Sequence, residues 1–354
     1  MRANVMRRVK CLGRSSHPMS TYIGLDVHKD WSFATVLDQT GRVVVQKRLE
    51  NEHVPSFLEN FNVLEIGLEA STHVAPLYRA LVGKGFAVEV CHPKKTRYIA
   101  EARIKSDRVD SKAIAELVRL DALPKSYMPP PEIAGLRERV RRRAFLVRER
   151  AKLMTKIRGL LAYEGVRPPE DFNLFTRKGF DWLRSLGLEP VDCYLRVMEV
   201  FNGEIRRLSF ELRHMACGDE DVKLLMTIPG LGYYLALLVK AEIGDVNRFK
   251  SGDHLCSYAG LVPSTRSSGG VTKRGGITRE GSRWLRWAMV EATITHVKCD
   301  TAISRSYHRI AERRGRKAAL VAIARRLLLS CYRVLKSRRP YEAFPSWSGV
   351  YESP

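Results

Sequence analysis

The sequence lacks any apolar run long enough to cross a bilayer, which takes about 18 to 20 consecutive residues. Its seven cysteines are scattered singly, with no C-x-x-C pair and no histidine at zinc-finger spacing. Neither a zinc finger nor a disulfide framework is therefore predicted, and a reducing compartment fits. The first 20 residues are basic and have no apolar core, which argues against a secretory signal. These absences favour a cytoplasmic protein with no membrane partner.

Acidic residues are scarce relative to basic ones. The chain has 61 Lys and Arg against 38 Asp and Glu, which gives a net charge of +23. Solubility does not need so large an excess, so the charge predicts a polyanionic partner, and nucleic acid is the favoured one. With 354 residues, of which 45% are hydrophobic, the chain can bury the cores of two or three domains.

Four carboxylates have the placement expected of a metal-dependent nuclease: Asp26, Glu69, Asp107 and Asp110. The first two each end an apolar run that predicts a buried strand. The last two open a predicted helix at 113–120, and their spacing of three residues puts both on one helix face. Such oxygen ligands suit Mg²⁺, and two ions about 4 Å apart would stabilise the attacking and leaving oxygens of a phosphoryl transfer. Taken singly, each acid could equally be a turn residue or a helix cap.

Residues 21 to about 125 alternate between strand-like and helix-like segments. Strands are expected at 22–26, 31–37, 41–49, 63–69 and 86–91, and helices at 53–61 and 75–83. This order predicts a mixed sheet with flanking helices. Ligands of open α/β sheets usually bind at the carboxyl ends of strands, where Asp26 and Glu69 fall.

Three consecutive prolines at 129–131 mark a boundary, and a long helix is expected at about 132–162. Residues 164–190 are expected to form an irregular insertion, after which a helix at about 191–216 returns antiparallel to the first. Apolar residues recur along the first helix at approximate helical spacing. They could pack a helical hairpin or a dimer partner.

Positive charge is concentrated on the first of these helices. Residues 137–158 contain ten Lys or Arg and two Glu. A solvated helix face is the plain alternative, but such faces usually mix signs, so contact with nucleic-acid phosphates is favoured. The candidate contacts are Arg137, Arg141, Arg142, Arg148 and Lys156.

The segment 224–243 fits the helix-hairpin-helix signature, in which apolar-x-x-apolar-Pro-Gly-apolar-Gly is followed by a helix. Gly230 and Gly232 would bring backbone N–H groups close to a phosphate, and the next helix N-terminus would add a favourable field. A simple Pro-Gly turn is the alternative. The high positive charge of the chain favours phosphate binding.

Glycine, serine and basic residues fill the segment 264–276, between an apolar stretch and a helix expected at 282–294. Such a segment cannot form a core, and it is expected to be a loop held by rigid flanks, where functional residues concentrate. A serine there could attack a phosphodiester, with Arg266, Lys273 and Arg274 stabilising the developing charge. From composition alone, a flexible turn whose hydroxyls cap the backbone is the favoured alternative.

The order of these motifs resembles that of the DEDD insertion-sequence transposases, the family guided by a bridge RNA. The resemblance covers nearly all of residues 21–340. It rests on the motifs at 22–26, 68–71, 106–112, 228–232, 258–263, 267–269 and 277–281. The sequence departs from the family at 70–73, where Ala-Ser-Thr-His replaces the more usual Ala-Thr-Gly. That departure leaves the carboxylates intact.

The resemblance implies three domains. They are an α/β domain of the RNase H/RuvC type at 21–128, a long helical coiled-coil segment at 129–218 and a mainly α serine transposase domain at 219–340, which contains the helix-hairpin-helix-like element. Residues 1–20 are expected to be a disordered basic arm and 341–354 a tail. Met19 competes with Met1 as the true start.

The resemblance also implies the roles of the site residues. Asp26, Glu69, Asp107 and Asp110 become the catalytic metal ligands, for Mg²⁺ or alternatively Mn²⁺. The nucleophile becomes a serine before Gly269, and Ser268 is chosen because it directly precedes that glycine. Ser267 is the rival, since the serine doublet leaves a one-residue ambiguity.

The implied activity is DNA strand exchange by a transposase through a phosphoserine intermediate. A bridge RNA would choose donor and target DNA by base pairing, and the protein would act as a homodimer or homotetramer at the bacterial nucleoid. One alternative is a hydrolytic RuvC-like endonuclease, which needs the carboxylates but no serine. A catalytically inactive nucleic-acid-binding protein is the other, and nothing in the sequence supports decay.

Overall fold

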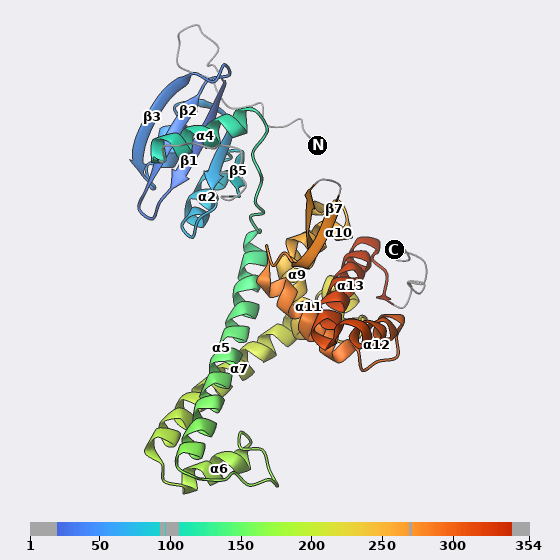
Figure 1. The fold of residues 1–354 in the computed structure, drawn as a ribbon. Coiled ribbons are helices and arrows are strands. Elements are labelled where there is room, and N and C mark those ends of the chain that lie inside the picture. The colour runs from blue at the N-terminus through green and yellow to red at the C-terminus, as the bar shows by residue number, and fades with distance from the viewer. Residues whose placement is uncertain (1–19, 93–95, 97–105, 269–270, 342–354) are drawn as a thin grey trace. The chain divides into compact units, whose positions relative to one another are not determined.

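The computed structural model describes residues 20–92, 96, 106–268 and 271–341. The chain divides into two compact units, residues 1–128 and 129–354 (Figure 1). The expected basic arm, the tail and the choice between Met1 and Met19 lie outside the described residues, apart from the residues 20 and 341 that border them. Among the described helices, none combines the length and the apolar character that a bilayer crossing requires.

The first unit is built on a five-stranded sheet. Its strands are β1 (Ser20–Val27), β2 (Trp31–Leu37), β3 (Val43–Glu50), β4 (Asn62–Glu69) and β5 (Val88–Cys91). They lie in the order β3-β2-β1-β4-β5. The first three form an antiparallel meander, while β4 is parallel to both β1 and β5. The expected mixed sheet is thus confirmed, and it is consistent with an RNase H-like domain.

Helices cover both faces of this sheet (Figure 1). On one face α1 (Val54–Leu58) and α2 (Val74–Gly83) pack against inward residues of β1, β2 and β4. On the other face lies α4 (Asp107–Arg119), whose apolar residues form a separate small core with Cys91. This helix begins six residues earlier than expected, because the Ser106 side chain accepts a hydrogen bond from the Val109 amide and caps it.

Two long helices dominate the amino-terminal part of the second unit. They are α5 (Pro131–Tyr163) and α7 (Glu189–Cys217), which pack side by side (Figure 1). The connection between them was expected to be irregular, but it contains α6 (Arg177–Ser185). Thr176 caps this helix by accepting the amide of Gly179, and its buried Phe180 and Leu183 join the core at the hairpin tip.

The rest of the second unit is a helical bundle with one β-hairpin. Its α-helices are α8 (Glu220–Met226), α9 (Tyr233–Ile243), α10 (Gly252–Tyr258), α11 (Arg283–His296), α12 (Ala302–Arg314) and α13 (Arg316–Ser337), and the short 3₁₀ helix η1 (Val246–Arg248) follows α9. One hydrophobic core joins α8, α9, α10, α11 and α13 to the neighbouring ends of α5 and α7. The carboxyl-terminal part of the chain is therefore mainly α, as expected.

The segment expected to be a loop is a β-hairpin instead. Strand β6 (Pro263–Ser268) pairs antiparallel with β7 (Val271–Ile277). The expectation was wrong because a segment needs no core of its own to form strands: the ladder pairs the backbone groups that face the partner strand. Outside the ladder, the Ser264 hydroxyl also donates to the carbonyl oxygen of Gly276, at 2.9 Å.

Candidate functional site: an acidic centre at the sheet edge

Asp26 and Glu69 lie at the same edge of the sheet. Asp26 is the penultimate residue of β1 and Glu69 is the last residue of β4. These strands are parallel neighbours, with Leu25 paired to Leu68. The next residue of each strand is therefore one of the two acids, and both occupy the carboxyl end of the sheet, where ligands of open α/β sheets usually bind.

Two adjacent glycines bring α4 to this edge. Gly24 and Gly67 are paired in neighbouring strands. A Cβ atom at Gly24 would overlap backbone atoms of Ser111 and Ala115, and one at Gly67 would lie 2.6 Å from a side-chain carbon of Ile114. Only glycine therefore lets α4 rest directly on the sheet. This contact holds the first helical turn, with Asp107 and Asp110, near the ends of β1 and β4.

Polar contacts with β2 and β3 also hold the amino-terminal half of α4. The hydroxyls of Thr35 and Ser111 lie 2.7 Å apart in a buried hydrogen bond. The Gln46 amide nitrogen donates to the Thr35 hydroxyl at 2.9 Å and to the carbonyl of Arg108 at 3.2 Å. The Arg108 guanidinium donates in turn to the Gln46 side-chain oxygen. These bonds restrict rotation and sliding of the helix that carries two of the acids.

His28, which the sequence interpretation missed, lies between two of the carboxylates. Its Nε2 atom is 3.5 Å from Oδ2 of Asp26 and 3.6 Å from Oδ1 of Asp107. One ligand atom from each of the three residues can be chosen so that all lie within 4.8 Å of one another. The Nε2 atom is buried and has no hydrogen-bond partner. The only sequence signal for His28 was its position two residues after Asp26, an aspartate at the end of a strand.

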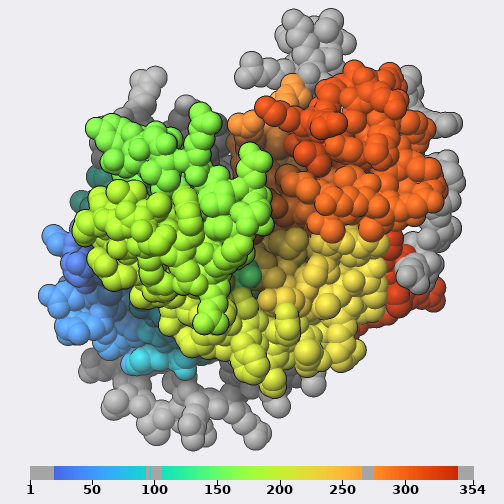
Figure 2. All heavy atoms as spheres, turned by 90° about the horizontal axis from the view of Figure 1, so that it is seen from below, coloured from blue at the N-terminus to red at the C-terminus, as the bar shows by residue number. Residues whose placement is uncertain are grey.

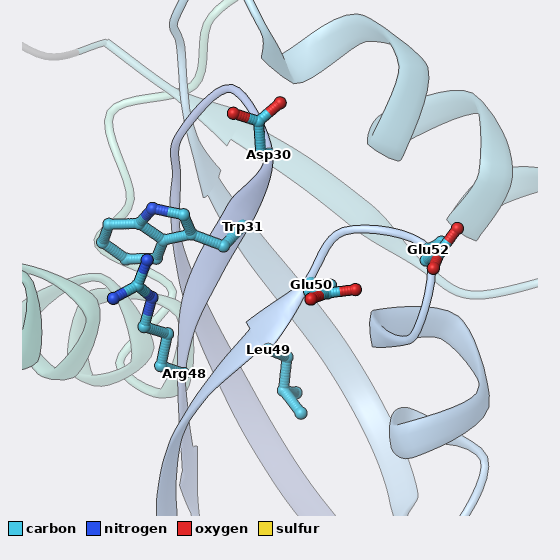
Figure 3. A pocket seen from close by; sticks show the side chains of 6 residues that line it. All are labelled: Asp30, Trp31, Arg48, Leu49, Glu50 and Glu52. Carbon is cyan, nitrogen blue, oxygen red and sulfur yellow. The ribbon is translucent and has the colours of Figure 1, made fainter.

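A stack of side chains supports the His28 ring. The ring lies 4.0 Å from the ring of Trp31, with 26° between the planes. The guanidinium carbon of Arg48 lies 4.0 Å from the Trp31 ring centroid, and Figure 3 shows the two groups together. They border an open hollow of about 800 Å³, which is also lined by Asp30, Leu49, Glu50 and Glu52. The His28 orientation is therefore set by β2 and β3 as well as by the carboxylates.

The surroundings of Asp26 disfavour the ionised form of its carboxyl group. The pKa of Asp26 is raised from 3.8 to about 6, chiefly by burial and also by the neighbouring charges of Glu69, Asp107 and Asp110, against an opposing effect of His28. A buried carboxyl group among other acids, beside an unpartnered imidazole nitrogen, is a donor set that fits a divalent cation. Asp26, His28 and Asp107 form the tight cluster, while Glu69 and Asp110 act on it from outside.

The candidate serine positions lie in the second unit, on β6. Ser267 is paired with Thr272 and Ser268 with Val271. Arg266 is paired with Lys273, and Thr265 with Arg274. Because successive residues of a strand alternate between its faces, the Ser267 and Ser268 positions lie on opposite faces of the hairpin. The four carboxylates all belong to the first unit.

The Pro-Gly turn joins α8 to α9. Gly230 has a φ of +92°, and a Cβ atom there would overlap the carbonyl oxygen of Ala292 on α11. Packing and backbone conformation are therefore enough to explain this glycine. Gly232 precedes the first residue of α9, and nothing lies within 4 Å of the position where its Cβ atom would be. The amino terminus of α9 is thus approachable at Gly232.

The basic residues singled out on α5 differ in their surroundings. Arg137 donates to the carbonyl oxygens of Ala241 and Glu242 at 2.6 and 2.9 Å. Arg141 binds the buried Glu242 carboxylate at 2.7 Å. Both therefore brace α5 against α9, a role that the sequence interpretation missed. The other three candidates keep more exposed side chains: Arg142, Arg148 and Lys156. Arg142 lies 3.4 Å from Glu138.

Two parts of the chain match profiles of known protein families. Residues 23–163 match the DEDD transposase profile of the IS110 type, and residues 222–309 match the profile described as the IS116/IS110/IS902 transposase family. A transposase for insertion sequence element IS1111A of Coxiella burnetii is 28% identical over 313 residues, which cover 85% of this chain and 86% of that one. A pilin gene-inverting protein of Moraxella bovis is 26% identical, with 91% and 98% covered. The chain belongs to the IS110-type family of DEDD insertion-sequence transposases.

Proposed function

We propose that this protein is a DNA transposase that exchanges strands at the ends of a mobile element through a phosphoserine intermediate. A divalent cation held by the acidic centre would assist the reaction, and a bridge RNA would choose the donor and target sequences. The observation that carries the proposal is the convergence of Asp26, His28 and Asp107 within 4.8 Å, with Glu69 and Asp110 acting on the same carboxyl group.

The donor set bears on the choice of cation. Carboxylate oxygens suit Mg²⁺ and Mn²⁺ alike, whereas an imidazole nitrogen is a poorer ligand for Mg²⁺. Asp26 and Asp107 would hold the cation directly, with Glu69 and Asp110 completing the negative charge around it. When bound, the cation supplies Lewis-acid stabilisation of phosphate oxygens. His28 would either join the ligands or orient the two carboxylates by donating its Nε2 proton.

Ser268 is the proposed nucleophile. Its oxygen would bond to the phosphorus of a DNA phosphodiester, the bond from phosphorus to one strand would break, and that strand would leave as a free hydroxyl. The serine proton would pass to the leaving oxygen through a base or solvent. Attack by the hydroxyl of a new partner strand then reverses these steps, so no phosphodiester is lost.

The hairpin register favours Ser268 over Ser267. Residues directly opposite each other in an antiparallel pair share a face, as do residues two apart on one strand. The Ser268 position therefore shares its face with Arg266 and Lys273, which are paired with each other. Cations on that face would stabilise the charge that develops on the phosphate. The Ser267 position shares its face with Arg274, which is paired with Thr265.

The number of subunits is linked to where the carboxylates and the serine lie in the chain. The carboxylates lie in the first unit and Ser268 in the second, so a composite site needs both units, from one subunit or from two. We propose a homodimer or homotetramer in the cytoplasm, beside the nucleoid DNA. The long α5–α7 hairpin would be the coiled-coil element, the turn at Gly232 the helix-hairpin-helix phosphate contact, and the first unit a RuvC-like domain. Arg142, Arg148 and Lys156 would contact phosphates.

The test compares protein–DNA adducts. Purified wild type, Ser267→Ala and Ser268→Ala, each with its co-purified RNA and Mg²⁺, are incubated with labelled DNA carrying the element ends. Denaturing gels should show an adduct in wild type and Ser267→Ala but none in Ser268→Ala. Loss only in Ser267→Ala would move the nucleophile by one residue. Nicked DNA with no adduct in any sample would instead identify a hydrolytic nuclease, and DNA binding with no cleavage an inactive binder.

A further inference from the structure

An aromatic groove lies between α5 and α11 of the second unit, and its lining residues are separate from those of the acidic centre and the serine hairpin. The tryptophan groove, as we call it, is lined chiefly by Arg143, Arg148, Tyr234, Arg283, Trp284 and Trp287. Its volume is about 470 Å³. A second hollow of about 690 Å³ shares Arg148, Arg283 and Trp284 with it, so the two adjoin. Figure 2 shows the surface recessed between green atoms of the helical hairpin and orange atoms of the bundle.

Trp287 is not a core residue, and Trp284 is only partly buried where it packs against the core. The buried face of α11 consists of Leu285, Ala288, Met289 and residues further along. Trp284 and Trp287 lie on a different face, with their ring centroids 6.1 Å apart and an angle of 83° between the rings. Trp287 is 38% exposed. Two neighbouring indoles that the fold leaves in contact with water indicate a binding surface.

Arginines accompany the aromatic rings. The guanidinium carbon of Arg143 lies 4.2 Å from the Tyr234 ring centroid, and that of Arg283 lies 5.9 Å from the Trp284 ring. Arg148 is exposed at the junction with the second hollow. Among the residues that the structure describes, those that line the tryptophan groove itself include no acidic side chain. Arg148 lies 3.7 Å from the Glu149 carboxylate, whereas the groove lining itself is aromatic and basic. Aromatic faces beside cations favour a ligand that is both planar and anionic.

We propose that the tryptophan groove binds an unpaired nucleotide of the nucleic acid on which the protein acts, an inference that rests on the proposed function. The base stacks on Trp287, and Arg148 and Arg283 contact the adjoining phosphates. A nucleotide inside a duplex cannot bind in this way, because its neighbours cover both faces of its base. The groove volume of about 470 Å³ also lies within the range of pockets that take small molecules.

Guide RNA and a displaced DNA strand would both present this chemistry, so the experiment uses both. Full-length protein is titrated into fluorescently labelled oligothymidine, oligouridine and a blunt DNA duplex of equal length, at one salt concentration. Fluorescence anisotropy reports the dissociation constant for each. The variants are Trp287→Ala and Trp287→Phe. The matched control is Phe210→Ala, because Phe210 is 76% exposed on α7 of the same unit but lies outside the groove.

Trp287→Ala should weaken binding of a single-stranded oligonucleotide by about tenfold, the loss expected for one stacked base, and leave duplex binding unchanged. Whichever of the two oligonucleotides loses more identifies the natural source. Trp287→Phe should retain most of the affinity, and Phe210→Ala all of it. Equal losses for duplex and single strands would overturn the proposal, as would unchanged binding by Trp287→Ala.

A shift of mass in light scattering for Trp287→Ala, without weaker oligonucleotide binding, would also overturn the proposal and make the groove a contact between copies of the chain. Failure of this inference is distinguishable from failure of the proposed function. If wild type exchanges DNA strands while Trp287→Ala binds oligonucleotides normally, only the groove is wrong. If wild type shows the expected tryptophan-dependent binding but no strand exchange or adduct, the groove stands and the proposed reaction falls.

Discussion

Replacing Asp26 with asparagine should stabilise the protein when no divalent cation is present. The Asp26 carboxyl group is buried beside three other acids, and its pKa is raised from 3.8 to about 6. A raised pKa means that folding disfavours the ionised form. Each unit of difference corresponds to about 1.4 kcal/mol, so about 3 kcal/mol of folding free energy is lost once the group is ionised in both states. Asparagine removes that charge at nearly the same volume.

The pH dependence gives this prediction its sign. Below pH 3.8 the carboxyl group is protonated in the folded and unfolded states alike, so there is no penalty. The penalty develops as pH rises from 3.8 to about 6 and is complete above that value. Asp26→Asn should therefore raise the free energy of unfolding by up to about 3 kcal/mol at pH 8, and by less than about 1 kcal/mol at pH 4.

Urea unfolding in EDTA at both pH values measures this difference, with Asp30→Asn as the matched control. Asp30 is exposed in the turn between β1 and β2, so its replacement should change little. Adding Mg²⁺ or Mn²⁺ at pH 8 should stabilise wild type through binding to the folded state and stabilise Asp26→Asn much less. If Asp26→Asn were no more stable than wild type at pH 8 in EDTA, the ionised Asp26 carboxylate would not oppose folding, and this reasoning would be refuted.

Three further predictions concern the packing around the proposed sites. Gly24→Ala should lower the free energy of unfolding by about 3 kcal/mol or more, because the added Cβ atom would overlap the backbone of α4. Gly83→Ala is the control and should be neutral in urea unfolding, since its Cβ atom would meet open space. Glu242→Ala should lower the free energy of unfolding by about 2 kcal/mol, because the buried carboxylate accepts hydrogen bonds from Arg141 and from the Ser282 hydroxyl. A smaller loss in thermal unfolding would contradict that estimate. Burial lowers the pKa of His296 below 6.5, so stability present above pH 6.5 should fall as the pH drops, and His296→Gln should abolish that slope.

Much of the first unit could be predicted because its signals are local. Strands with buried apolar residues and acids at their ends identify the sheet and place Asp26 and Glu69 at one edge. The role of His28 could not be predicted in this way. Its position beside Asp107 depends on how closely α4 lies on the sheet, which is decided by Gly24 and Gly67, and both glycines are distant from Asp107 in the sequence.

The second unit was harder to predict because its features depend on partners distant in sequence. The helix α6 is short, and it gains its stability from the hairpin-tip core. The β6–β7 hairpin forms through backbone pairing, which composition does not reveal. The sequence predicts that Arg137 and Arg141 contact nucleic acid. Their hydrogen-bond partners within the protein, Ala241 and Glu242, lie more than 100 residues away in the sequence. Part of the positive charge on α5 therefore also serves contacts within the protein, which the local sequence does not reveal.

The central claim is that the acidic centre provides the cation site that strand exchange requires. The most direct measurement is the rate of joining of labelled element ends to target DNA by wild type, Asp107→Asn and Asp121→Asn, with Mg²⁺, with Mn²⁺ and with EDTA. Asp121 is exposed just beyond the other end of α4, so it is the matched control. The account predicts that Asp107→Asn lowers the rate of joining by about 100-fold or more, while Asp121→Asn joins ends at the wild-type rate. EDTA should stop joining by wild type and by Asp121→Asn. Joining by Asp107→Asn at the wild-type rate, or by wild type in EDTA, would contradict it.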